Sequence, residues 1–249
     1  MPKKLRLTGN TLKLIAAFSM LLDHIGIILF PRVIAFRIIG RLAFPIFAFM
    51  VAEGCRYTRS KARYVFEVFA LGVLCQLGYY FLDRSLYMRV LITFTLGILV
   101  CFSLQNAKDI CFAPNPLGMK VLSVLLFALS VTVIYCLNQL FTIDYGFWGC
   151  MLPVFPLLAR PPKENAPPWW QTMDSIAGRV LLFGIGLLIL TINLGGIQIY
   201  SLAALVLLLL YSGKRGKAKM KYFFYIFYPA HLAILEGISM LAVLIKSSL

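Results

Sequence analysis

The chain has 249 residues, of which 61% are hydrophobic and 13% charged, and its mean hydropathy is +0.88. These values lie far from those of soluble domains and predict a protein that resides in a lipid bilayer. The net charge of +15 does not indicate nucleic-acid binding, because the basic residues form short clusters between apolar segments and not one polar face.

Nine apolar segments follow one another along the chain, each near the length of about 20 residues that crosses a bilayer. They cover residues 11–30, 38–55, 64–82, 86–106, 118–140, 145–160, 177–194, 196–211 and 222–245. Pro45 predicts a kink in the second segment, and the short sixth segment, with Pro153 and Pro156, is either broken or re-entrant. We therefore predict an all-α polytopic membrane protein with about nine transmembrane helices and a single domain over residues 1–249.

The charged loops predict the orientation of these helices. If the N-terminus is cytoplasmic, eighteen of the 24 basic residues fall on the cytoplasmic side, as the positive-inside rule requires. The basic residues left outside are Arg32, Arg37, Arg41, Arg84, Arg89 and Lys246. The expected location is the cytoplasmic membrane, with the loop 214–221 inside and the C-terminus outside.

The first segment carries three ionisable residues, Lys13, Asp23 and His24. On an α-helix Lys13 and His24 lie within about 20° of one face and about 16 Å apart. Charges inside a membrane cost about 2.5–3.5 kcal/mol each and usually mark a functional site, although contacts between helices are the alternative. Asp23 either sets the tautomer of His24 or serves a different partner, since adjacent helical residues point about 100° apart.

The second histidine, His231, lies about 14 Å from the start of the last segment, at a depth similar to that of His24. Two histidines at one depth predict a shared cavity if their helices touch. The alternative is an isolated hydrogen-bonding residue after a kink at Pro229.

Further polar residues have two interpretations each. Glu53 either pairs with Arg56 or Arg59 or contacts a substrate, and Asp144 either forms a turn or helix cap or belongs to a site.

Arg37 and Arg41 either reach lipid headgroups or bind an acceptor carboxylate or another anion. The six cysteines show neither a CxxC motif nor zinc-site spacing, so we predict no metal site.

Several motifs along the chain resemble the TraX family of membrane proteins, whose best-known member acetylates the N-terminus of a conjugative pilin subunit. They are NTLKLIAAFSMLLDHIG (10–26), RIIGRLAFPIFAFMVAEG (37–54), IDYGFWG (143–149), YSGKRG (211–216) and KYFFYIFYPAHL (221–232). More distantly, the spacing of Lys13 and His24 is similar to the Arg-x10-His pattern of multi-span acyltransferases that modify surface glycans, with lysine in place of arginine.

The resemblance implies transfer of acetyl from cytoplasmic acetyl-CoA to an amine of a membrane-presented acceptor. The expected catalytic residues are His24 as general base, Asp23 as its partner and His231. The expected acetyl-CoA contacts are Lys13, Arg56, Arg59, Lys214 and Arg215, and the expected acceptor contacts are Arg37, Arg41, Glu53 and Asp144. A covalent acetyl-histidine is a second route.

Other functions remain open at this stage. They are O- or N-acetylation of a cell-surface glycan, proton-coupled transport of a small solute, which also needs ionisable residues inside the membrane, and a non-enzymatic role in assembly. The expected partners are acetyl-CoA, membrane lipids and a peptide or glycan acceptor, with no nucleic acid.

Overall fold

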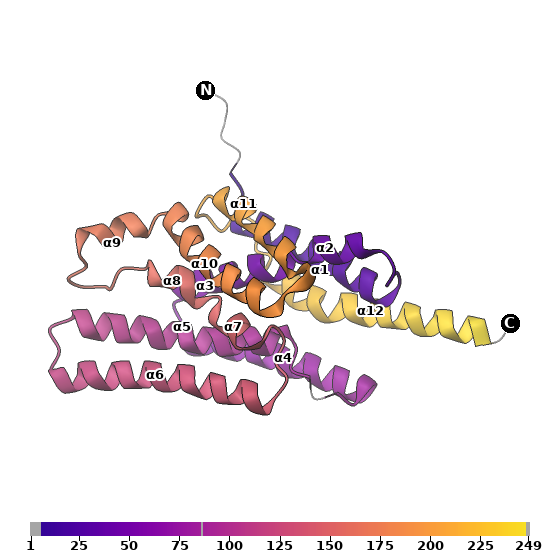
Figure 1. Ribbon diagram of the computed structural model, residues 1–249, viewed down its shortest axis with the longest axis horizontal. Helices are drawn as coiled ribbons and strands as arrows, with labels where there is room; N and C mark the ends of the chain where they lie inside the picture. Colours follow the sequence, from indigo (N-terminus) through magenta and orange to yellow (C-terminus); the bar gives the residue numbers. More distant parts are fainter. Residues whose placement is uncertain (1–5, 86, 248–249) are drawn as a thin grey trace, which may run out of the picture. The chain divides into compact units, whose positions relative to one another are not determined.

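The structure, a computed structural model, describes residues 6–85 and 87–247 (Figure 1). Lys3, Lys4 and the last two residues, which entered the orientation prediction, lie outside these ranges. All regular structure in the described ranges is helical, apart from two isolated β-bridges. The protein is therefore an all-α polytopic membrane protein, as predicted.

Within the described ranges, seven helical segments are long and apolar enough to cross a membrane. They are α1 (Gly9–Ile28), α2 (Ile34–Gly40) with α3 (Ala43–Tyr57), α4 (Lys61–Asp83), α5 (Val90–Phe112), α6 (Leu117–Leu140), α10 (Ile176–Leu194) and α12 (Lys221–Ser247). Two shorter apolar segments are each built from two helices: α7 (Gly146–Met151) with α8 (Val154–Leu158), and the 3₁₀-helix η1 (Gly196–Ala203) with α11 (Ala204–Leu209). A short helix, α9 (Pro168–Met173), lies between α8 and α10. Each of the nine predicted segments contains a helix, but in the part of the chain that the structure describes only seven have the length of a span.

The chain divides into two compact units. The terminal unit comprises Met1–Phe47 and Gly195–Leu249, and the central unit comprises Ala48–Leu194. Helix α3 leads from the first unit into the second, and the chain returns after α10. The single domain that the sequence suggests stays a prediction.

In the terminal unit, α1 and α2 pack closely in antiparallel directions. A Cβ added to Gly26 would lie 2.7 Å from Phe36 Cβ, and one added to Gly40 would overlap the Asp23 side chain. Small residues at such positions let two membrane helices approach closely. The two glycines therefore set the distance between α1 and α2.

The short segment η1–α11 runs beside α1 in the opposite direction. At one end, Leu7 N donates to Leu210 O, 2.8 Å away. At the other end, the Arg41 side chain bonds both Gln198 and Asp23. A 3₁₀-helix rises about 2.0 Å per residue against about 1.5 Å in an α-helix, so η1 extends further than its length suggests. This short segment thus accompanies α1 over most of a membrane crossing.

In the central unit, α7 and α8 likewise run along α5. Before α7, Asp144 N donates to Met88 O across a parallel bridge at 2.8 Å. After α8, the Lys108 ammonium near the end of α5 donates to the carbonyl oxygens of Leu157 and Leu158, at 3.3 and 3.0 Å. The sixth predicted segment is therefore broken between its two helices, but it does not turn back.

Helices α1 and α12 run in the same direction. Near their starts, Gly9 N donates to Lys214 O and Asn10 Nδ2 donates to Ala218 O, at 2.8 and 2.7 Å. Further along, His24 of α1 contacts His231 of α12. Both helices therefore enter the membrane from the same side.

This arrangement gives a test of the predicted orientation. We expect Arg32→Cys, in the exposed turn between α1 and α2, to react with a membrane-impermeant thiol reagent in intact cells. Lys219→Cys, in the exposed segment before α12, should react only after the cells are opened. Both variants are made in a chain without native cysteines. The reverse labelling pattern would invert the orientation.

Candidate functional site

The terminal unit brings the two histidines of the chain together. His24 Nδ1 and His231 Nε2 lie 3.4 Å apart, and the two rings meet edge to face with centroids 5.0 Å apart. His231 is 5% exposed and stacks on Phe227. The depth similarity seen in the sequence thus corresponds to a direct contact.

Backbone carbonyls determine the tautomer of each neutral ring. Nδ1 of His24 lies 2.8 Å from Met20 O, and Nδ1 of His231 lies 2.7 Å from Phe227 O. Because a carbonyl oxygen only accepts, each Nδ1 must carry a hydrogen. His231 Nε2 then holds a lone pair and accepts from His24 Nδ1–H. The proton-accepting nitrogen of His24 is therefore Nε2.

Asp23 is bonded to two arginines of the α2 region. Arg41 Nη2 lies 2.9 and 3.0 Å from the two carboxylate oxygens, and Arg37 Nη1 lies 3.1 Å from Oδ1. The contacts at His24 Nδ1 come instead from Met20 and His231. The observed bonds of Asp23 therefore match the interpretation in which it serves a partner other than His24, here Arg41 and Arg37.

Sequence reasoning missed Gln198, which lies beside this ion pair. Its Oε1 accepts from Arg41 Nη1 at 3.4 Å, and the residue is 4% exposed. The signal was a glutamine two residues after the Gly195–Gly196 pair in an apolar segment. Its spacing from Asp23 carried no information, since 174 intervening residues separate the two.

Three predicted donor-binding residues gather at the start of α1. The backbone carbonyls of Lys214 and Arg215 accept from Gly9 N and Asn10 N at 2.8 and 2.9 Å. The Lys13 ammonium, one turn further, lies 6.0 Å from the centroid of the Phe224 ring. The three basic residues thus belong to one end of α1, and Lys13 lies eleven positions before His24.

The loop that carries Lys214 and Arg215 has a backbone that favours glycine. Gly216 has φ +99°, and a Cβ there would lie 3.0 Å from Thr8 Oγ1. Thr8 in turn caps α1 by accepting from Thr11 N. The YSGKRG motif therefore fits closely against the start of α1.

The other predicted residues belong to the central unit. Glu53 pairs with Arg179 and Arg56 pairs with Asp174, so the predicted pairing of Glu53 with Arg56 or Arg59 was wrong. Arg59 is exposed. The buried Glu53–Arg179 pair joins α3 to α10, which gives it a role in packing.

Asp144 lies at the turn before α7. Its Oδ1 accepts from the Tyr87 hydroxyl at 2.8 Å, and burial together with the Asp144 charge raises the pKa of Tyr87. The residue that precedes α7 is Tyr145, in a left-handed conformation with φ 60° and no side-chain cap. Asp144 therefore does not cap α7 but fixes the turn through Tyr87.

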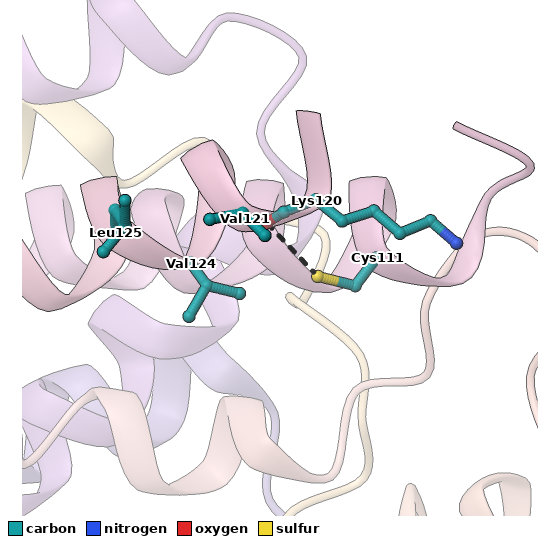
Figure 2. A pocket seen from close by; sticks show the side chains of 5 residues that line it. All are labelled: Cys111, Lys120, Val121, Val124 and Leu125. Carbon is teal, nitrogen blue, oxygen red and sulfur yellow. Dashed lines mark hydrogen bonds between the residues drawn. The ribbon is translucent and has the colours of Figure 1, made fainter. Parts of the chain in front are cut away.

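A surface pocket of about 260 Å³ lies where α5 ends and α6 begins (Figure 2). Its lining is largely apolar, and the Cys111 thiol lies 3.9 Å from Lys120 O. Figure 2 shows no predicted site residue among the five that line it. In the described ranges, no group of three or more His, Cys, Asp or Glu side chains could hold a metal ion.

Comparison with known proteins agrees with the motifs. A family model described as TraX protein matches residues 8–239. The chain belongs to the TraX family. This match covers α1, the 211–216 loop and the part of α12 that carries His231.

Two relatives show which proteins this TraX chain is similar to. One, from Dichelobacter nodosus, is described as a probable fimbrial assembly protein FimC, serogroup H1, and is 26% identical over 94% of this chain and 97% of its own length. The other is an uncharacterised protein, RP591, from Rickettsia prowazekii (strain Madrid E), 28% identical over 63% of this chain and 57% of its own length. No solved structure matches the chain.

The close approach of α2 to α1 in this TraX chain can be tested by adding one methyl group. Gly40→Ala should lower the free energy of unfolding by about 1–3 kcal/mol, because the methyl overlaps the Asp23 side chain. Thermal unfolding in detergent measures the effect. Gly78→Ala in α4 is the matched control: nothing lies within 4 Å of its added Cβ, so helix propensity should stabilise it by about 0.5–1 kcal/mol. Equal effects at both positions would contradict the close packing.

Proposed function

We propose that this TraX protein is a membrane-embedded acetyltransferase that transfers acetyl from acetyl-CoA to an amine of a membrane-presented acceptor such as a peptide or pilin N-terminus. Family membership and the name of the Dichelobacter relative support a role connected with fimbriae. The observation that carries the chemistry is the His24–His231 contact inside the membrane helices, since the bonds at His24 Nδ1 place the hydrogen of the neutral ring there and its lone pair on Nε2.

In the proposed reaction, His24 Nε2 takes a proton from the acceptor amine. The amine nitrogen forms a bond to the thioester carbonyl carbon, the carbon–sulfur bond breaks, and the coenzyme A thiolate leaves and takes the proton from His24 Nε2, which restores the neutral base. The His24 imidazolium formed between these steps donates from Nδ1 to Met20 O and to His231 Nε2, which stabilise its charge. His231 is thus a positioning residue.

The thioester oxyanion requires a donor. His231 cannot supply one in this tautomer, because its Nδ1–H is bound to Phe227 O and its Nε2 accepts from His24. We therefore assign the contact with the oxyanion to an arginine of the 37–41 segment and not to His231. A covalent acetyl on His24 Nε2 is a second route through the same nitrogen.

The start of α1 is the proposed site for the phosphates of acetyl-CoA. Lys214, Arg215 and Lys13 bring positive charge to the start of α1, where the helix dipole also favours negative charge, although the first N–H groups of α1 are already bonded within the chain. Lys13 and His24 share one face of α1 at a separation of about 16 Å, along which the extended arm of the donor would reach the base.

A role in assembly without catalysis is the second candidate, favoured by the name of the Dichelobacter relative. Incubation of the purified protein with acetyl-CoA separates the two. Release of coenzyme A is expected for the transferase, whereas an assembly protein should release none.

If His24 is the general base, its replacement should lower the rate of acetyl transfer strongly and change the stability of the fold little. His24→Ala and His24→Gln should lower acetyl transfer by about 10² to 10⁴-fold, since neither side chain takes up a proton at working pH. Initial rates and thermal unfolding are measured together. An active His24→Gln protein would end the general-base assignment, and a parallel loss of stability and activity would indicate a packing role.

His231 supplies the control within the same experiment. His231→Gln keeps an oxygen that can accept from His24 Nδ1–H, so it should retain most of the activity and the pH profile. His231→Leu removes the acceptor and should lower the rate. Equal activity of the two variants would contradict the positioning role.

The donor site predicts an effect on the Michaelis constant. Replacing Lys214 and Arg215 together with Gln should raise KM for acetyl-CoA about tenfold or more and change kcat little, because charge contacts hold the donor equally in ground and transition states. The matched control replaces Lys217 and Lys219, which are exposed in the same loop and carry the same charge. Equal KM values for the two double variants would remove Lys214 and Arg215 from the donor site.

A further inference from the structure

Gln198 carries a buried donor that nothing in the described residues uses. Its Oε1 accepts from Arg41 Nη1, and its Nε2 has no hydrogen-bond partner in the described part of the chain. An arginine can only donate, so the amide oxygen must face Arg41 and the NH2 group must point elsewhere. The orientation of the unused donor is therefore determined.

Arg37 presents a second such donor to the same cluster. Its Nη1 lies 3.1 Å from Asp23 Oδ1 but off the hydrogen-bonding direction, so in the described ranges it makes an ion pair without a hydrogen bond. Both oxygens of Asp23 are already bonded to Arg41. Two donors, from α2 and η1, thus remain around one ion pair.

The charge of the cluster favours an anion. Arg37 and Arg41 carry two positive charges against the single negative charge of Asp23, which leaves one positive charge in a membrane helix bundle. An unsatisfied donor or an uncompensated charge is costly at such a position, and such groups mark sites where a ligand supplies the missing partner.

The backbone before Gln198 fixes its place. Gly195 and Gly196 have φ +65° and +55°, values that side chains disfavour, and Gln198 N donates to Gly195 O at 3.2 Å. No atom lies within 4 Å of a Cβ added at either glycine, so the turn conformation alone explains them. Two glycines in left-handed turn conformations thus precede the buried amide of Gln198.

We infer that Gln198, Arg37 and Arg41 form a subsite for a carboxylate of the acceptor. A carboxylate has two oxygens, which can take one donor from Gln198 and one from Arg37, and its charge balances the cluster. Asp23, which bonds Arg41 and pairs with Arg37, directly precedes His24 on α1, so the cluster and the proposed base lie at the same level of this helix. The inference rests on the proposed function for its link to the acceptor, although the anion site can be tested without it.

The test measures binding of acetate, the simplest carboxylate, to the purified full chain in detergent. Thermal unfolding is followed while acetate replaces chloride at constant ionic strength, since a ligand of the folded state raises Tm in a saturable way. We expect saturable stabilisation of the natural chain. Gln198→Leu and Arg37→Gln should weaken acetate binding about tenfold or more, as for loss of a hydrogen bond to a charged group.

Two further variants keep the test decisive. Gln105→Leu in α5 is the control, since Gln105 is also 4% exposed with an Nε2 that has no hydrogen-bond partner in the described ranges, and it should leave acetate binding unchanged. Gln198→Glu keeps the shape and a partner for Arg41 but places negative charge in the subsite, so it should abolish binding even if Gln198→Leu fails to fold.

Several outcomes would overturn the subsite. They are no saturable effect of acetate on the natural chain, equal acetate binding by Gln198→Glu, or stabilisation by inorganic phosphate but not by acetate. Acetyl transfer is measured separately. If acetate binding depends on Gln198 but the chain has no transferase activity, the proposed function is wrong and the subsite is supported. If the chain transfers acetyl but acetate binding is unchanged in the variants, the subsite is wrong and the proposed function is supported.

Discussion

The ion pair between Asp23 and Arg41 is the constraint on which the terminal unit depends. A lone charge inside a membrane costs several kcal/mol, so each partner must lie where the other can reach it. Their bonding holds α2 against α1, and the second nitrogen of Arg41 holds η1 through Gln198. Gly40 permits this approach, because any larger residue would occupy the space of the carboxylate. Three segments are thus positioned by one guanidinium group.

Part of this site could be predicted from the sequence, because the geometry of a single helix relates the positions of its own residues. Lys13 and His24 share a face by spacing alone, and the depths of His24 and His231 follow from counting residues within two spans. The contact between α1 and α12 could not be derived, since no local pattern says which helices are neighbours. Gln198 and the partner of Glu53 were missed for the same reason: Arg179 lies 126 residues from Glu53 along the chain.

The sequence predicts the all-α class of the fold well but predicts the lengths of the individual helices less well. Apolar runs identify the long helices and the two shorter apolar segments but not α9, which lies between predicted segments, and hydropathy does not distinguish one long helix from two short ones. Pro153 starts the break between α7 and α8, and the Gly195–Gly196 turn precedes a 3₁₀-helix whose greater rise per residue shortens the segment needed. Two of the predicted spans therefore have fewer residues than a bilayer-crossing α-helix requires.

The division of the terminal unit between the two ends of the chain has a consequence for biosynthesis. Helices α1 and α2 leave the ribosome first, and the Asp23–Arg41 pair can neutralise itself as soon as both are in the membrane. Gln198 and His231 follow only after the whole central unit has been made. Nascent chains and products of premature termination therefore contain the acidic and basic residues of the cluster without the second histidine. The full set of site residues therefore exists only in a finished polypeptide, and an unfinished chain cannot form the complete site.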